Sequence, residues 1–131
     1  MKRLICLAVL LCASVALAES TALSTAKKLL AAFNAQDAEA MAALVTDDFE
    51  LIYVDDAGKG AVALVGPEAL KKEMTGYFKA LPEVQSEIEG VVDGERFVSF
   101  RERIVGGQSS LAVYEIDAGK IRRVWYYPAE H

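Results

Sequence analysis

The spacing of apolar residues changes near residue 84, and this change limits the folds that the chain can adopt. Before it, outside two short strand-like stretches at 49–54 and 61–65, apolar side chains recur three and four residues apart, which is typical of helices that bury one face. After it, Val84, Ser86 and Ile88 alternate with polar residues, which is typical of strands. A chain with helices first and strands afterwards is predicted to be an α+β domain, with helices packed against a mostly antiparallel sheet.

Three helices are expected in the N-terminal half. The first spans Ser20 to about Asn34, and Asp37 can cap a short second helix. The third opens at 66–68, where proline suits the first helical position and a glutamate favours the positive end of the helix dipole. We expect Pro82 to end this third helix, and Asp47 with Asp48 to end the second.

About six strands are expected. Residues 49–54 and 61–65 are predicted to pair as a hairpin around a turn at 55–60. The remaining strands follow residue 84, and Asp93-Gly94 is the predicted first turn between them. Long twisted strands do not stay flat, so we expect the sheet to curl into a cone. Helices on the concave face would then enclose a small-molecule pocket.

The first 18 residues have the three parts of a secretory signal peptide. Lys2 and Arg3 are followed by an apolar run over 4–17, and Ala16-Leu17-Ala18 is a small-x-small cleavage site. A membrane anchor is the less favoured alternative, because a spanning helix needs roughly 18 or more apolar residues. We therefore expect residues 19–131 to form one domain that is periplasmic or secreted and is not attached to the membrane after cleavage.

The composition of this expected mature chain excludes several classes of function. Loss of Lys2 and Arg3 changes the net charge from −5 to −7, which disfavours nucleic acid as a partner. Both cysteines, Cys6 and Cys12, lie in the signal, so no disulfide or thiol chemistry is expected. The single histidine is His131, so neither a metal site nor a histidine base is expected. No glycine-rich phosphate loop opens a helix, and no cofactor is expected.

The order of these elements resembles the NTF2-like superfamily, and within it the SnoaL-like proteins. The stretches that carry the resemblance are AAFNAQDAEAMAALVTDDFELIYVD, GPEALKKEM, VVDGERFVSF and VYEIDAGKIRRVWYY. The resemblance implies an NTF2-like cone, in which a curved antiparallel or mixed sheet wraps around the three helices. It also implies a homodimer that associates through the outer face of the sheet. The superfamily includes isomerases, cyclases, dehydratases and binding domains, so the fold alone does not select a function.

Asp55 is the candidate catalytic residue. In the ketosteroid isomerases of the superfamily, an aspartate at the end of the first hairpin strand is the general base, and Asp55 or Asp56 resembles it. Strand parity places Asp55 on the face of Leu51 and Tyr53, so we expect it to point into the cavity, near Trp125. The alternative is an ordinary hairpin turn, which aspartates favour because their side chains bond to the backbone two residues on.

The acidic hydrogen-bond donors that such an isomerase needs are absent. The position that resembles the isomerase tyrosine is Leu29, and the position of the second acid falls near Ser110 or Leu111. Neither can stabilise an enolate oxygen as an acidic donor does. Isomerisation of a ketosteroid is therefore not expected.

Several apolar and charged side chains are candidates for the pocket. Arg101 on the inner face could bind a carboxylate, but salt bridges on a solvated face are the alternative, since Val98, Phe100 and Ile104 would make the better core. Aromatic residues line pockets, and they also build cores and dimer interfaces. The residues predicted to line the pocket are Leu29, Phe33, Tyr53, Tyr77, Phe78, Arg101 and Trp125.

Two functions remain open. One is a non-catalytic module that binds a small apolar or amphipathic molecule in the cone. The other is an acid–base enzyme, such as an isomerase, cyclase or dehydratase, that uses Asp55 as its base. An enzyme requires a buried carboxyl with a raised pKa and a second donor nearby, whereas a binding module requires only an apolar cavity. A cone filled by its own side chains would support neither.

Overall fold

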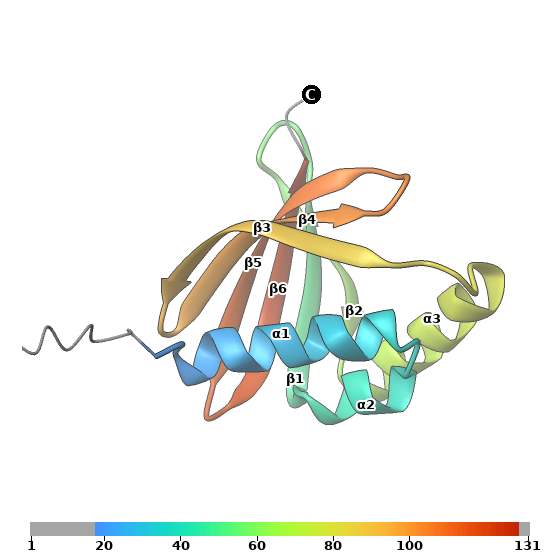
Figure 1. Ribbon diagram of the computed structural model, residues 1–131, viewed down its shortest axis with the longest axis horizontal. Helices are drawn as coiled ribbons and strands as arrows, with labels where there is room; N and C mark the ends of the chain where they lie inside the picture. Colours follow the sequence, from blue (N-terminus) through green and yellow to red (C-terminus); the bar gives the residue numbers. More distant parts are fainter. Residues whose placement is uncertain (1–17, 129–131) are drawn as a thin grey trace, which may run out of the picture.

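The computed structural model describes residues 18–128, which form three helices and six strands (Figure 1). The expected signal peptide lies outside the described residues except for Ala18. In chain order the elements are α1 (Thr21–Asn34), α2 (Ala38–Ala43), β1 (Val45–Val54), β2 (Gly60–Val65), α3 (Pro67–Ala80), β3 (Ser86–Gly94), β4 (Phe97–Ile104), β5 (Ser109–Asp117) and β6 (Lys120–Pro128).

The six strands form one curved sheet in the order β2-β1-β6-β5-β4-β3. Strand β1 pairs with β6 in parallel, and every other pair is antiparallel. This crossover places the first hairpin beside the last strand, and the helices cover the concave side (Figure 1). The prediction of an α+β cone with a mixed sheet is confirmed.

The helices begin where local capping chemistry places them. The Ser20 side chain accepts a hydrogen bond from the Leu23 amide at 3.0 Å, and Asp37 does the same for the Ala40 amide at 3.0 Å. Helix α3 has Pro67 at its first turn and no side-chain cap. These contacts satisfy amide groups that have no partner inside the helix, so the predicted starts are confirmed.

Two element boundaries differ from the predictions. Asp47 and Asp48 do not end α2; they lie in β1, which begins at Val45. The parallel pairing of Val45 with Ile121 extends the strand backwards, and a local pattern does not show a partner that lies so far along the chain. In the β3–β4 hairpin, Gly94 still pairs with Phe97, so the turn falls on the two residues after the predicted Asp93-Gly94.

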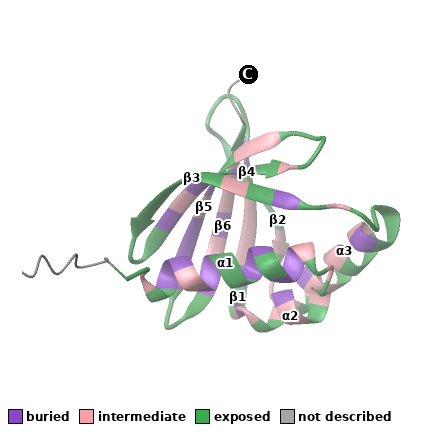
Figure 2. Ribbon diagram, in the orientation of Figure 1, coloured by how far each residue is buried: buried purple, intermediate pink, exposed green. Residues whose placement is uncertain are grey.

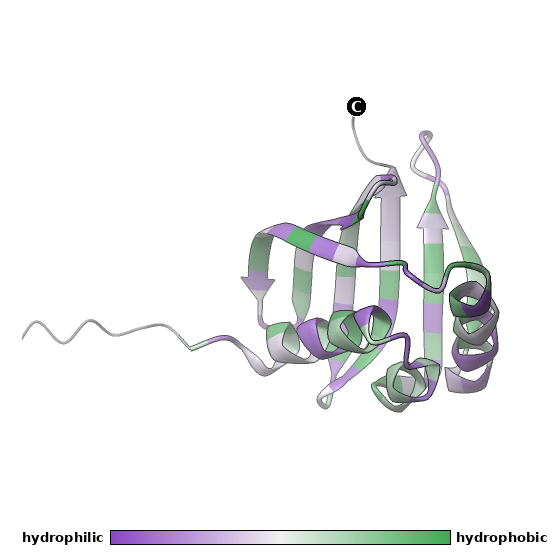
Figure 3. Cartoon of the chain, turned by 45° about the vertical axis from the view of Figure 1, so that its right-hand side comes forward, coloured by the Kyte–Doolittle hydropathy of each residue, from purple (hydrophilic) through white to green (hydrophobic). Residues whose placement is uncertain are grey.

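The core lies between α1 and the concave face of the sheet (Figure 2). Along the strands, hydrophobic segments are interspersed with hydrophilic ones, in keeping with a sheet that has one buried face (Figure 3). In β4, Val98 and Phe100 are almost fully buried, whereas Arg101 and Arg103 point outward. The largest fully buried side chains are Tyr114, Phe49, Phe100, Ile121, Val45, Val98 and Val124.

A helix that crosses a membrane needs about 20 mostly apolar residues. None of the helices within residues 18–128 is long and apolar enough to cross a membrane.

Candidate functional site

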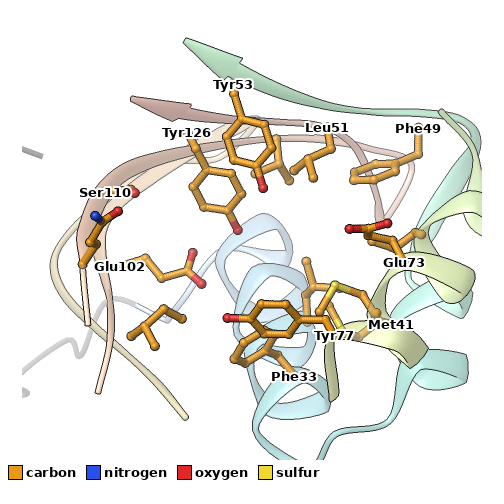
Figure 4. Close-up of a pocket in the computed structure, with 16 residues that line it drawn as sticks. Phe33, Met41, Phe49, Leu51, Tyr53, Glu73, Tyr77, Glu102, Ser110 and Tyr126 are labelled. Atoms are coloured by element: carbon orange, nitrogen blue, oxygen red, sulfur yellow. The ribbon is translucent and has the colours of Figure 1, made fainter. Parts of the chain in front are cut away.

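A cavity of about 240 Å³ lies between the helices and the concave face of the sheet (Figure 4). Helices α1, α2 and α3 contribute one wall, and strands β1, β4, β5 and β6 contribute the other. The residues that line it are Leu29, Phe33, Met41, Phe49, Leu51, Tyr53, Leu70, Glu73, Met74, Tyr77, Glu102, Ile104, Gln108, Ser110, Val124 and Tyr126. The sequence therefore leaves the cone partly empty rather than filling it with side chains.

The cavity is mainly apolar, with a few polar groups that point into it. Tyr53 and Tyr126 direct their hydroxyl groups toward the interior, and the Glu102 carboxyl faces the same space (Figure 4). Pockets for drug-sized ligands measure roughly 300–1,000 Å³, so this cavity suits a smaller molecule. Apolar walls with a few convergent polar groups are the usual composition of a ligand site.

Glu102 is the central polar residue of the cavity. It lies on β4, and only 8% of its surface is exposed. The Ser86 hydroxyl donates to its Oε1 at 3.1 Å, and the Tyr114 hydroxyl lies 3.5 Å from its Oε2. These neighbours are neutral, so the carboxyl has hydrogen-bond donors but no cation beside it.

Burial controls the acid–base behaviour of this cluster. Loss of hydration raises the pKa of the Glu102 carboxyl, while hydrogen bonds from Ser86, Tyr126 and Tyr114 partly oppose the rise. The pKa of Tyr114 and that of Tyr126 are raised well above 10, first by burial and then by the nearby Glu102 charge. Both phenols therefore stay protonated at neutral pH and remain hydrogen-bond donors.

Tyr53 stands at the mouth of the cavity. It is 54% exposed, and its ring stacks on that of Tyr126 with the centroids 5.8 Å apart. Partial burial raises the pKa of the Tyr53 hydroxyl, with smaller contributions from Glu73, Tyr77 and Glu102. A ligand that enters past Tyr53 would therefore meet this pair of stacked aromatic rings.

Comparison with known families agrees with this cone-shaped fold. A family model described as SnoaL-like domain matches residues 26–124. The chain belongs to the SnoaL-like domain family. No curated protein matches the sequence.

Solved structures share the fold of this SnoaL-like domain. An uncharacterized cystatin fold protein from Novosphingobium aromaticivorans is 27% identical, with 83% of this chain and 98% of that chain covered and a TM-score of 0.68. A SnoaL-like protein of unknown function from Burkholderia thailandensis is 17% identical, with 84% and 95% covered and a TM-score of 0.67. A computationally designed 17-OHP binder is 19% identical, with 86% and 93% covered and a TM-score of 0.64.

The SnoaL-like domain brings together four of the predicted pocket residues and leaves out three. Leu29, Phe33, Tyr53 and Tyr77 line the cavity. Phe78 instead packs in the core, with its ring edge-on to that of Phe33 at 5.3 Å. Arg101 and Trp125 lie on the outer face of the sheet. There, a guanidinium nitrogen of Arg101 lies 3.7 Å from the Glu89 carboxylate, and the ring centroids of Trp125 and Phe97 are 6.5 Å apart.

The structure places Asp55 in the hairpin turn, where its carboxylate is exposed and outside the cavity. Its Oδ1 accepts hydrogen bonds from the Ala57 amide at 3.0 Å and the Lys59 amide at 2.8 Å. The expectation that Asp55 points toward the cavity is therefore wrong. Parity holds through Tyr53, but β1 ends at Val54 and the chain turns before the next inward position.

Sequence reasoning missed Glu102 and Tyr126 as site residues. Glu102 is on the face of Val98, Phe100 and Ile104, which was correctly favoured as the core side of β4. A glutamate on a strand face that is otherwise apolar was the available signal. Tyr126 lies inside because it pairs with Tyr53 across the parallel β1–β6 contact, which also turns the neighbouring Trp125 outward.

The described part of the SnoaL-like domain has no arrangement suited to a metal. Between residues 18 and 128, no group of three His, Cys, Asp or Glu side chains is placed to hold a metal ion. Glu102 and the phenols beside it can offer hydrogen bonds and proton transfer within the apolar cavity.

Proposed function

We propose that this SnoaL-like domain protein is an exported binding module that holds a small, largely apolar molecule in its cavity. The observation that carries the proposal is the cavity itself, which has mostly apolar walls and a few inward polar groups. The designed 17-OHP binder supports the proposal, because it uses the same fold to hold a small molecule. The cavity of about 240 Å³ favours a smaller occupant than a drug-sized molecule.

A pair of adjacent substitutions tests this binding. Ser110 lines the cavity, whereas Ser109 is the preceding residue on β5 and faces the other side of the strand. We expect a small neutral probe, 3,3-dimethyl-1-butanol, to bind the wild-type protein and the Ser109→Phe variant. It should bind Ser110→Phe at least about tenfold more weakly, because the new ring fills the cavity. Equal affinity for both variants would contradict the proposal.

A second candidate function, acid–base catalysis, is favoured by the position of Glu102. This carboxyl is buried at the cavity with a raised pKa and has two phenols beside it, which is the environment that a general base requires. Exposed Asp55 has no access to the cavity, so Glu102 replaces it as the candidate base. Wild-type protein that exchanges solvent deuterium into the α-carbons of cyclohexanone, while Glu102→Gln does not, would support this function.

Self-association and export complete the proposal. A row of outer-face residues crosses the sheet in register, from Val92 through Ser99, Val113, Trp125 and Ile52 to Val62. Exposed Phe97 and Leu111 flank this row, so the outer face offers an apolar surface to a second copy.

Export is supported by the signal-like composition of residues 1–18.

A further inference from the structure

The cavity contains acidic side chains but no basic ones. Glu73 of α3 and Glu102 of β4 line it, and no lysine, arginine or histidine is among the described residues that surround it. The six ion pairs of residues 18–128 involve other side chains, so neither glutamate has a counter-ion in this part of the chain. The charge of the cavity therefore has one sign.

The burial of Glu102 makes this imbalance energetically significant. The carboxyl is nine-tenths buried, and its partners Ser86 and Tyr114 contribute dipoles but no charge. A buried charge is stabilised well only when an opposite charge lies beside it. A ligand that brings a positive charge would supply what the protein does not, whereas a carboxylate or phosphate ligand would add to the repulsion.

The other walls of the cavity also suit a cation with apolar substituents. Five aromatic rings line it, from Phe33, Phe49, Tyr53, Tyr77 and Tyr126 (Figure 4). The face of an aromatic ring carries partial negative charge and attracts alkylammonium groups within about 6 Å. The two carboxyls lie on different sides of the same space (Figure 4). Apolar, aromatic and anionic surfaces thus surround one small volume.

We propose that the cavity binds a small organic cation, an amine or quaternary ammonium with apolar substituents, and that Glu102 and Glu73 are its counter-ions. This inference rests on the proposed binding function and adds the charge of the ligand. It predicts that the cavity prefers a cation to a neutral ketone or alcohol of the same size, because a neutral ligand does not offset the charge of the two carboxylates.

Three probes of nearly the same shape test the sign of the charge. Choline is the cation, 3,3-dimethyl-1-butanol is its neutral carbon analogue, and 3,3-dimethylbutanoate is an anion with the same tert-butyl group. Each is titrated into the protein at constant ionic strength and followed by calorimetry and by amide chemical shifts. We expect choline to bind about tenfold or more tightly than the alcohol, because the cation gains both ring and carboxylate attraction. The anion should bind more weakly than either.

Two variants test whether Glu102 and Glu73 cause the preference for choline over the alcohol. Glu102→Gln and Glu73→Gln should each reduce the affinity for choline about five- to tenfold and leave that for the alcohol nearly unchanged. Glu39→Gln removes the same charge from the exposed side of α2 and should change neither affinity. Glu73 is exposed, so its replacement tests the inference even where loss of the buried Glu102 disturbs folding.

The outcomes separate this inference from the proposed function. Equal binding of choline and the alcohol, or preference for the anion, would overturn the cation inference and leave the binding function intact. A choline preference that survives both cavity variants would also overturn it. Binding of none of the three probes would contradict both.

Discussion

The Ser86 hydroxyl donates a 3.1 Å hydrogen bond to Oε1 of Glu102. This buried bond links the edge strand β3 to its neighbour β4. Ser86 is itself held from α1. The Asn34 side chain accepts from the Ser86 amide at 2.7 Å and donates to the Ser86 carbonyl at 3.0 Å. The end of the first helix thus fixes the strand that orients the buried carboxyl.

The stability of the protein should depend on the charge of Glu102. Burial raises the pKa of this carboxyl above its ordinary 4.5 in the folded state, so the folded protein binds the proton more tightly than the unfolded chain. This stabilisation is fully present below the unfolded pKa and is lost as the pH rises through the folded pKa. Relative to wild type, Glu102→Gln should therefore become more stable as the pH rises through that window.

Urea unfolding between pH 4 and pH 8 measures this difference. Glu39→Gln on the exposed side of α2 is the matched control for the change of charge. A stability difference between Glu102→Gln and wild type that does not change with pH would show that the carboxyl titrates alike in both states.

Asn34 should contribute to stability through its two bonds to Ser86. Asn34→Ala leaves the part-buried Ser86 amide and carbonyl without these partners. We expect a loss of about 1–3 kcal/mol in the free energy of unfolding. Thr75→Ala removes one exposed bond within α3 and should cost less than about 0.5 kcal/mol. Equal effects of the two substitutions in urea unfolding would argue against the role assigned to Asn34.

Asp55 should stabilise the β1–β2 turn without taking part in binding. Asp55→Ala removes acceptors for the Ala57 and Lys59 amides and should cost about 0.5–1.5 kcal/mol, because these amides return to water in an exposed turn. Affinity for 3,3-dimethyl-1-butanol should stay within about twofold of wild type. The neighbouring Asp56→Ala is the control for loss of charge, and a selective loss of binding in Asp55→Ala would restore Asp55 to the site.

The outer face of the sheet should mediate a homodimer. Leu111 is 46% exposed on this face, and Leu81, after α3, is exposed to a similar extent at 48%. Leu111→Glu should convert the dimer to a monomer in sedimentation at micromolar concentration, because a charge would be buried at the contact. Leu81→Glu should leave the dimer intact. A wild-type protein that sediments only as a monomer would rule out this use of the face.

The exported form should begin at Glu19. The described chain is anchored just beyond that point, where the Ser20 amide donates to Asp93 at 3.0 Å. Intact-mass measurement of protein recovered from outside the cytoplasm should show the loss of residues 1–18. Ala18→Arg should block cleavage, because the site requires small residues. A wild-type mass that retains these residues would refute the signal peptide.

Local chemistry explains why most of the fold could be predicted. Ser20 and Asp37 cap their helices through residues three positions away, and the two-residue period after Val84 depends only on neighbours in the chain. The same period showed which face of β4 would be buried. A two-residue period along β1 placed Tyr53 on the inner face, and the three- and four-residue spacing of α1 placed Leu29 on its apolar side. These patterns involve residues that are close together in the chain, so they can be detected in a single sequence.

Only the tertiary structure decided which residue of β6 faces the cavity and whether Glu102 is buried. Both faces of β6 carry an aromatic residue and an arginine, so its sequence pattern does not choose between Trp125 and Tyr126. The choice comes from the parallel pairing of Tyr126 with Tyr53, which joins segments more than 70 residues apart. Likewise, Glu102 becomes a buried acid only because α1 and the tyrosines of β5 and β6 close over it. Burial and pairing are properties of contacts between distant segments, and the acid–base character of the cavity depends on them.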